Sequence, residues 1–182
     1  ALILNNEYCF DKNYILYEIN NSRKRLSVNT IDCLYMHNID MIRTYLSNDD
    51  YDKICNDLFS VLKELIDKNI IRFCGISTWD GFRVPEDHQN YISLSYFINL
   101  ANRYNVSQAF KIIQFPLGIW GTEAITEKYQ SIDVHDEKVN IIEAAKHYGL
   151  YVVTNSPLLQ GNLIQEGIFD LQGLHFSTKA SV

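Results

Sequence analysis

The fold is decided by residues 22–38, S-R-K-R-L-S-V-N-T-I-D-C-L-Y-M-H-N, in which a basic helix end leads through a short turn into an apolar strand. The strand is predicted for residues 31–36 and ends at the polar pair His37 and Asn38. In α/β enzymes, a histidine at the carboxyl end of a buried parallel strand lies where catalytic side chains are usually found. A single histidine in that place is more often structural than functional, so the remainder of the chain has to decide between the two.

The same layout recurs three more times. Apolar runs rich in β-branched and aromatic residues predict three further buried strands, and the starts of the four strands are 40, 39 and 40 residues apart. One strand and one helix per repeat exclude propeller blades and helical solenoids, and indicate a parallel sheet covered by helices. The predicted strands span residues 31–36, 71–76, 110–115 and 150–154, and the predicted helices span residues 12–26, 52–68, 93–104 and 137–148.

The lengths of the connections narrow the fold class further. Long connections follow the strands, whereas the connections that lead from helix to strand are short. Elaboration on the carboxyl side of the strands is typical of the functional face of a (β/α)8 barrel. A doubly wound sheet has the same asymmetry but usually carries a glycine-rich phosphate turn, and the sequence contains neither G-x-G-x-x-G nor G-x-x-x-x-G-K. The sequence therefore favours an α/β fold based on part of a TIM (β/α)8 barrel.

Composition excludes several classes of function. The 182 residues include 16 Lys and Arg against 22 Asp and Glu, for a net charge of −6, which disfavours nucleic-acid binding. The longest apolar run, residues 112–120, is interrupted by Gln114 and Pro116 and is too short to cross a membrane. The first residues lack the basic region of a signal peptide, and the four cysteines show no C-x-x-C spacing. We therefore expect a cytoplasmic protein.

Neutral hydrogen-bonding side chains follow all four predicted strands. An imidazole, hydroxyls and two carboxamides that converge at one edge would suit a carbonyl or an amide-bearing ligand, and would be poor ligands for a metal ion. Taken singly, an amide such as Gln114 or Asn155 is more often a satisfied core residue than a ligand, and Trp79 could line a pocket or merely cover the barrel. Asp32 is predicted to be structural, at the opposite end. Histidines predicted to be solvent-exposed are His88, His135, His147 and His175.

Four segments together resemble the aldo/keto reductase family. Residues 22–38 resemble its helix, R-L-G-x-x-x-I-D motif and strand ending in His, and L-K-E-L-I-D-K-N-I-I-R-F-C-G-I-S-T is similar to its next helix and strand. I-I-Q-F-P-L is similar to its sixth strand, and A-A-K-H-Y-G-L-Y-V-V-T-N-S-P-L-L-Q-G to its seventh. S-T-W-D-G-F-R resembles a motif, T-W-(N/D)-G-F-R, of one subgroup of the family.

The resemblance implies an oxidoreductase that uses NADP(H), with NAD(H) as the alternative cofactor, to reduce a small carbonyl substrate. Thr78 stands where the family usually has Asn, and Asn155 stands where an aromatic residue commonly stacks on the nicotinamide. By the same resemblance His37 is the catalytic histidine, Ser77, Thr78, Gln114, Asn155, Ser156, Leu158 and Gln160 contact the cofactor, and Asn38 and Trp79 contact the substrate.

The resemblance also implies that residues 1–182 form a single aldo/keto-reductase-like domain truncated at both ends. The four predicted strands would be strands four to seven, and the first three strands and the eighth would be missing. The second and third of the missing units would supply the catalytic Tyr, Lys and Asp. The parent enzyme would then reduce an aldehyde or ketone to an alcohol, and this part would be inactive alone. The alternative is a catalytically silent nucleotide-binding or regulatory interaction module on an incomplete barrel. Apolar edge strands predict self-association.

Overall fold

A four-stranded parallel sheet forms the centre of the computed structural model, which describes residues 3–4, 8–132 and 137–165. Its strands lie in the order β3-β4-β5-β8, and every neighbouring pair is parallel. Each strand begins and ends within one residue of its predicted position. Their bounds are Ile31–His37 for β3, Ile71–Ser77 for β4, Phe110–Pro116 for β5 and Tyr151–Asn155 for β8.

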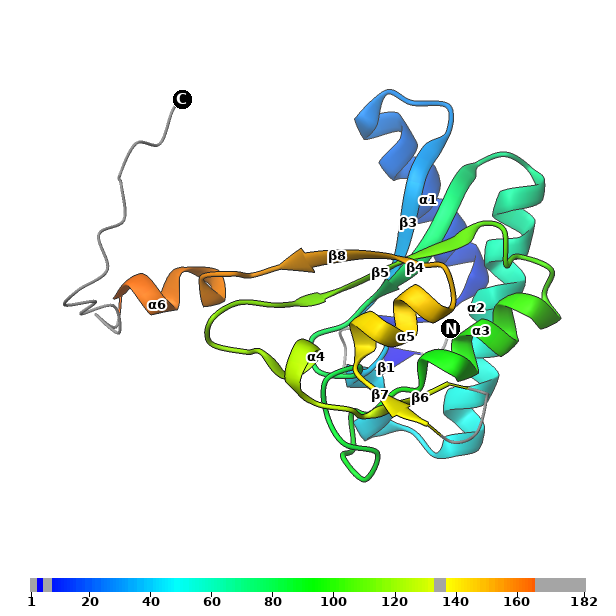
Figure 1. Ribbon diagram of the computed structural model, residues 1–182. Coiled ribbons are helices and arrows are strands. Elements are labelled where there is room, and N and C mark those ends of the chain that lie inside the picture. Colours follow the sequence, from blue (N-terminus) through cyan, green and yellow to red (C-terminus); the bar gives the residue numbers. More distant parts are fainter. Residues whose placement is uncertain (1–2, 5–7, 133–136, 166–182) are drawn as a thin grey trace.

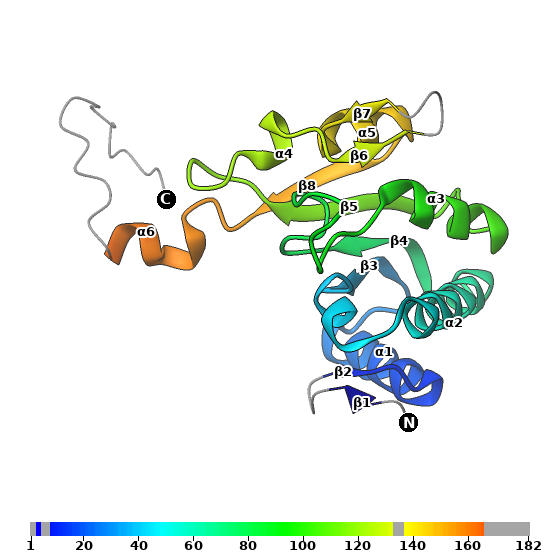
Figure 2. The same cartoon turned by 90° about the horizontal axis from the view of Figure 1, so that it is seen from below.

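Each strand of the sheet is preceded by a helix, and these helices lie together on one side of the sheet (Figures 1 and 2). Side-chain caps explain where they begin, since Asp11, Ser47, Ser93 and Asn140 each accept a hydrogen bond from a backbone N–H of the first turn. The helices are α1 (Lys12–Leu26), α2 (Asn48–Asp67), α3 (Leu94–Arg103) and α5 (Ile141–His147).

Two of these helices begin more than one residue away from their predicted starts. Helix α2 begins four residues earlier than expected because Ser47 caps it. Helix α5 was predicted from residue 137, but Lys138 and Val139 form strand β7 and pair with β6. The helix then begins after Asn140, which forms a capping box with Glu143.

Several short elements lie outside the regular repeat and were not predicted. Periodicity cannot reveal them, because each contains only two to five residues. They are the hairpin of β1 (Ile3–Leu4) and β2 (Tyr8–Cys9), η1 (Met41–Tyr45), α4 (Glu123–Thr126), the hairpin of β6 (Gln130–Ser131) and β7 (Lys138–Val139), η2 (Leu159–Gly161) and α6 (Asn162–Gln165).

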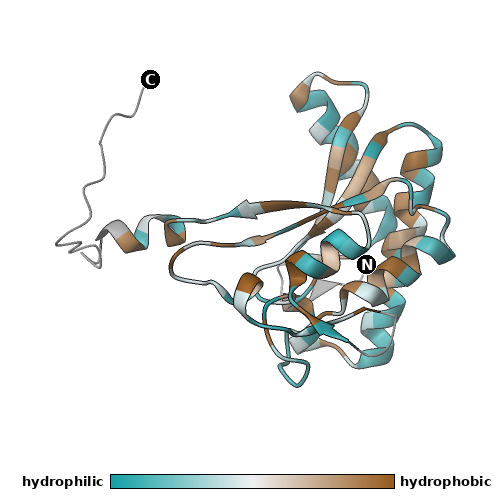
Figure 3. Cartoon of the chain, viewed as in Figure 1, coloured by the Kyte–Doolittle hydropathy of each residue, from teal (hydrophilic) through white to brown (hydrophobic). Residues whose placement is uncertain are grey.

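The hydrophobic core lies between the sheet and its helices. Apolar residues concentrate on the strands and on the helical surfaces that face them (Figure 3). Alternate strand residues enter this core, and none of the side chains at its centre is more than 1% exposed. These central side chains are Phe59, Leu65, Ile76, Phe97, Phe110, Ile113 and Phe115.

The opposite side of the sheet, here called the open face, carries no helix (Figure 2). Its residues include Phe73, Tyr151 and Val153, whose exposed fractions are 43%, 71% and 37%. The edges of the sheet are β3 and β8. A parallel sheet with all helices on one side is a segment of a (β/α)8 barrel, in which the open face lines the interior. The predicted fold class is therefore confirmed.

Two further predictions concern exposed residues and membranes. Asp32 lies near the start of β3, away from the carboxyl ends, and forms an ion pair with Arg72 at 2.8 Å, in agreement with a structural role. His88 and His147 are exposed as predicted, while His135 and His175 lie outside the described residues. No helix in the described part of the chain combines the length and apolar character required to cross a bilayer.

Candidate functional site

Three of the predicted site residues lie side by side at the carboxyl ends of the central strands. His37 is paired in register with Ser77, and Ser77 with Gln114. Residues paired laterally in a parallel sheet project to the same side, so the three side chains share the open face. We call His37, Ser77 and Gln114 the strand-end row.

Asn155, the fourth residue expected at this edge, is displaced along the sheet. The partner of Gln114 on β8 is Val153, whereas Asn155 is paired with Pro116. Asn155 therefore projects from the same side and the same end of the sheet as the strand-end row, but two residues beyond it.

A hydrogen bond orients the amide in the strand-end row. The hydroxyl of Ser77 donates to Oε1 of Gln114 at 2.9 Å, and Ser77 is buried while Gln114 is half-buried. Because Oε1 already accepts from Ser77, the amide NH2 is the group of Gln114 that remains for a ligand. A ligand with a carbonyl oxygen could accept this hydrogen bond.

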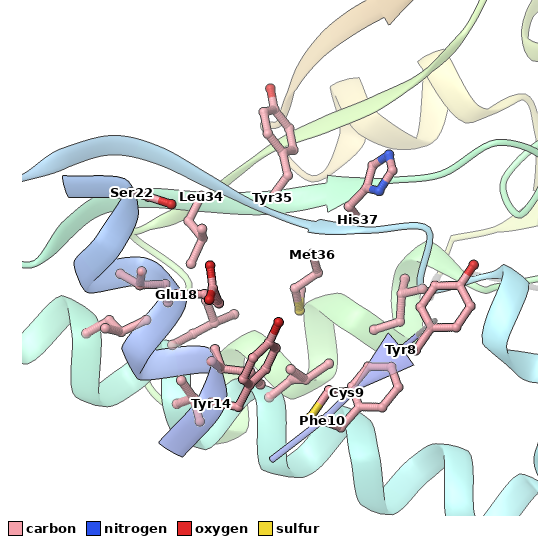
Figure 4. Close-up of a pocket in the computed structure, with 17 residues that line it drawn as sticks. Tyr8, Cys9, Phe10, Tyr14, Glu18, Ser22, Leu34, Tyr35, Met36 and His37 are labelled. Carbon is pink, nitrogen blue, oxygen red and sulfur yellow. The ribbon is translucent and has the colours of Figure 1, made fainter. Parts of the chain in front are cut away.

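His37 is exposed at the sheet edge and points away from the helices. Figure 4 shows Tyr35 and His37 on one side of β3, and Leu34 and Met36 on the other. This alternation places the imidazole on the open face, where its N–H can donate a hydrogen bond to a bound carbonyl group.

Two buried polar atoms near the strand-end row lack a hydrogen-bond partner among the described residues: Oγ1 of Thr78 and Oδ1 of Asn155. Native proteins pair almost all buried polar atoms, so a buried atom without a partner calls for an explanation. A carboxamide offers both N–H donors and a carbonyl acceptor, and could therefore satisfy such atoms. The residues present thus fit the nicotinamide carboxamide of NADP(H).

The loop after β4 is held by a carboxylate that sequence reasoning missed. Asp40 is fully buried, and its Oδ2 accepts hydrogen bonds from the backbone N–H groups of Trp79, Asp80 and Gly81 at 3.2, 2.9 and 2.9 Å. Burial raises the pKa of Asp40, although the backbone hydrogen bonds oppose this effect. Nothing in the local sequence marks Asp40, because its partners lie about 40 residues away.

The remaining predicted contacts lie on connecting segments. Asn38 directly follows β3 with a positive φ of 54°, and its backbone N–H donates to the carbonyl of Ser77 at 2.7 Å. Ser156 follows β8 and is half-buried. Leu158 and Gln160 are exposed and lie on the segment that extends away from the sheet toward α6 (Figure 1), so the structure does not bring them beside the strand-end row.

A cavity of about 420 Å³ lies beside β3 and reaches His37 at one end (Figure 4). It is enclosed by α1, α2 and the segment around Tyr8 and Phe10, on the side of β3 that faces the helices. Of the strand-end row, His37 is among its lining residues while Ser77 and Gln114 are not, so the cavity adjoins the candidate site only at its β3 end. Within residues 3–4, 8–132 and 137–165, no group of three or more His, Cys, Asp or Glu side chains could hold a metal ion.

Comparisons with known proteins agree with this architecture. The model of the aldo/keto reductase family matches residues 3–114, which include the strand-end row. Among solved structures, the chain is similar to a glycerol dehydrogenase from Gluconobacter oxydans, with 16% identity and a TM-score of 0.54. That alignment covers 94% of this chain and 39% of the other.

A second similar structure is an aldo-keto reductase from Bacillus halodurans in its holo form, with 18% identity and a TM-score of 0.51. Here the alignment covers 85% of this chain and 40% of the other, so the chain spans about two fifths of the length of both relatives. At these identities the likeness concerns the fold alone. A search of curated protein sequences found no significant match.

Proposed function

Because the chain belongs to the aldo/keto reductase family, we propose that it contributes to the active site of an oxidoreductase that reduces a small carbonyl compound to an alcohol with NADP(H). The observation that supports this proposal is the hydrogen bond between Ser77 and Gln114. It leaves the NH2 group of Gln114 to donate to a ligand, in the same row of strand ends as His37. NAD(H) is the alternative cofactor.

The proposed cofactor site combines the groups described above. Ser77, Thr78, Gln114 and Asn155 would hold the nicotinamide carboxamide, and the two buried atoms without partners support this assignment. The cofactor supplies a hydride when it is bound. Ser156, Leu158 and Gln160 would flank the pyrophosphate, a role that requires the exposed segment after β8 to approach the bound cofactor.

His37 has a different role in the proposed site. Its imidazole N–H would donate a hydrogen bond to the substrate oxygen and stabilise the negative charge that develops there. Asn38 and Trp79, which follow β3 and β4, would contact the remainder of the substrate. We assign no proton donor among the described residues.

Cofactor binding tests this proposal directly. The fluorescence of NADPH should change on titration with the folded chain, and NADH measured in parallel gives the cofactor preference. His37→Ala should leave this binding intact, because the imidazole is assigned to the substrate rather than to the cofactor. The proposal fails if the folded chain binds neither NADPH nor NADH.

Measurements of turnover then distinguish an enzyme from the alternative function, a catalytically silent module. The chain alone is expected to show no NADPH oxidation with an aldehyde panel. In the longer parent enzyme that the resemblance implies, His37→Ala should lower the rate by roughly 10²–10³, as expected for the loss of one oxyanion donor. His147→Ala is the matched control, because His147 is an exposed histidine on α5. Cofactor binding by the parent without turnover would instead support a catalytically silent nucleotide-binding module.

A further inference from the structure

A continuous chain of contacts joins the four loops that follow β3, β4, β5 and β8. At one end, Asp40 holds the backbone N–H groups that begin the loop after β4. At the other end, Nε1 of Trp120, in the loop after β5, donates to the carbonyl oxygen of Ser156 at 2.9 Å. Arg83 lies between these two ends and connects them.

Arg83 is almost completely buried, with 6% of its side chain exposed. Its Nε and Nη2 donate to the carbonyl oxygen of Trp79 at 3.2 and 2.9 Å. Its Nη1 donates to Oε2 of Glu123 at 2.8 Å, and a carboxylate oxygen of Asp80 lies 3.6 Å from Nη2. A buried charge is tolerated only when it is paired and hydrogen-bonded, so these contacts restrict the guanidinium to one position.

The guanidinium also contacts the aromatic pair formed by Trp79 and Trp120. Its central carbon lies 5.7 Å from the centroid of the Trp120 ring, within the range of a cation–π interaction. The two indole rings stack with centroids 6.1 Å apart and an interplanar angle of 22°. Arg83 therefore holds Trp79 through its backbone carbonyl and Trp120 through its ring.

We propose that Arg83 is a positioning residue for the carbonyl reduction proposed above. It fixes the Trp79–Trp120 stack beside the strand-end row, and through Trp120 it fixes the backbone of Ser156 at the cofactor side of the site. This inference rests on the proposed function, but its structural part, the dependence of the indole stack on Arg83, can be measured without any cofactor.

The sequence provides a direct probe of the stack, because Trp79 and Trp120 are its two tryptophans. Stacked indoles couple their electronic transitions, so the circular dichroism of the unsubstituted chain should differ from the sum of the contributions measured in Trp79→Phe and Trp120→Phe. We expect Arg83→Met to abolish this coupling. Arg72→Met is the matched control, since Arg72 forms an ion pair with Asp32 near the opposite end of the strands and is 66% exposed.

Cofactor affinity provides the second readout. Arg83→Met should weaken NADPH binding by about tenfold, because Ser156 loses the constraint that Trp120 imposes, whereas Arg72→Met should bind as the unsubstituted chain does. If Arg83→Met does not fold, Glu123→Ala is used in its place. It removes the ion-pair partner of Nη1 from a side chain that is 45% exposed, and should reduce both the coupling and the affinity.

The outcomes separate the two proposals. Unchanged coupling in folded Arg83→Met or Glu123→Ala overturns the positioning role, and so does lost coupling with unchanged NADPH affinity. If the unsubstituted chain binds neither NADPH nor NADH, the proposed function fails, and with it the cofactor part of this inference. The circular dichroism still decides whether Arg83 holds the indole stack.

Discussion

Ser77 and Gln114 are joined across β4 and β5 by a hydrogen bond of 2.9 Å in which the serine hydroxyl donates to the amide oxygen. The bond ties together two residues 37 positions apart in the sequence. With its oxygen engaged by the hydroxyl, the amide has its NH2 group left to donate. Gln114 is thereby prepared to donate a hydrogen bond to a ligand.

Substitution of this amide tests the orientation. Gln114→Glu keeps an acceptor for Ser77 but lacks the N–H donor, and it adds a negative charge. We expect the Kd for NADPH to rise by about tenfold or more, which is the size of effect expected when a ligand loses a hydrogen bond. Gln108→Glu, an exposed position before β5, is the control. Equal affinities for the two variants would contradict the assigned role of Gln114.

Because β4 and β5 approach each other closely at Gly75, we expect substitution of this residue to destabilise the fold strongly. A Cβ atom added there would lie 1.9 Å from the carbonyl oxygen of Ile112, next to the register shift at Cys74 and Gly75. Gly75→Ala should therefore lower the free energy of unfolding by about 3 kcal/mol or more, or prevent folding. Chemical denaturation followed by circular dichroism measures this loss.

Gly149 provides a comparison in which substitution destabilises the fold through the backbone conformation rather than through a steric clash. A Cβ atom there would have no neighbour within 4 Å, but the residue has a φ of +65°. Gly149→Ala should cost only about 1–2 kcal/mol, the usual cost of a left-handed conformation for a residue with a side chain. If Gly149→Ala proved the more damaging substitution, the strand spacing described for Gly75 would be wrong.

The open face predicts self-association of the chain. Tyr151 is 71% exposed and Val153 37% exposed, and both lie on the edge strand β8. Apolar surface on an unpaired edge strand promotes association. Size-exclusion chromatography with light scattering should show oligomers, and Val153→Lys should shift them toward the monomer. Tyr17→Lys, at a 61% exposed position on α1, should not. A compact monomer of the unsubstituted chain would contradict this prediction.

The lowered pKa of Glu64 predicts how the stability of the protein depends on pH. Hydrogen bonds from Lys12 and Lys68 lower the pKa of Glu64 from 4.5 to about 2. A lowered pKa in the folded state contributes stability above the unfolded value, and this contribution is lost as the pH falls from about 4.5 to about 2. The melting temperatures of the unsubstituted chain and Glu64→Gln should therefore differ at neutral pH and converge at low pH.

Salt provides a further test of the same interaction. Glu64 lies at the surface, so high ionic strength should reduce the difference between the unsubstituted chain and Glu64→Gln. Asp57→Asn, at an exposed position on the same helix, is the control, and its difference from the unsubstituted chain should change less with salt. A difference for Glu64→Gln that is insensitive to both pH and salt would show that the two lysine contacts are not electrostatic in origin.

The sequence by itself determined the repeated strands and helices, because apolar periodicity reflects the burial of each element locally. It also identified the side chains that follow the strands, since parallel strands end at one edge of the sheet. The start of α5 was predicted incorrectly because β7 pairs with β6, and such pairing depends on a partner elsewhere in the chain.

Only the tertiary structure decided how the site residues are related to one another. The register of β5 and β8 places Asn155 two residues beyond the strand-end row, a shift that no local pattern records. Asp40 and Arg83 are buried polar groups that each have a partner 40 residues away, at Asp80 and Glu123 respectively. Their importance arises from the loss of water around them, which makes each distant partner necessary. That condition exists only once the chain has folded.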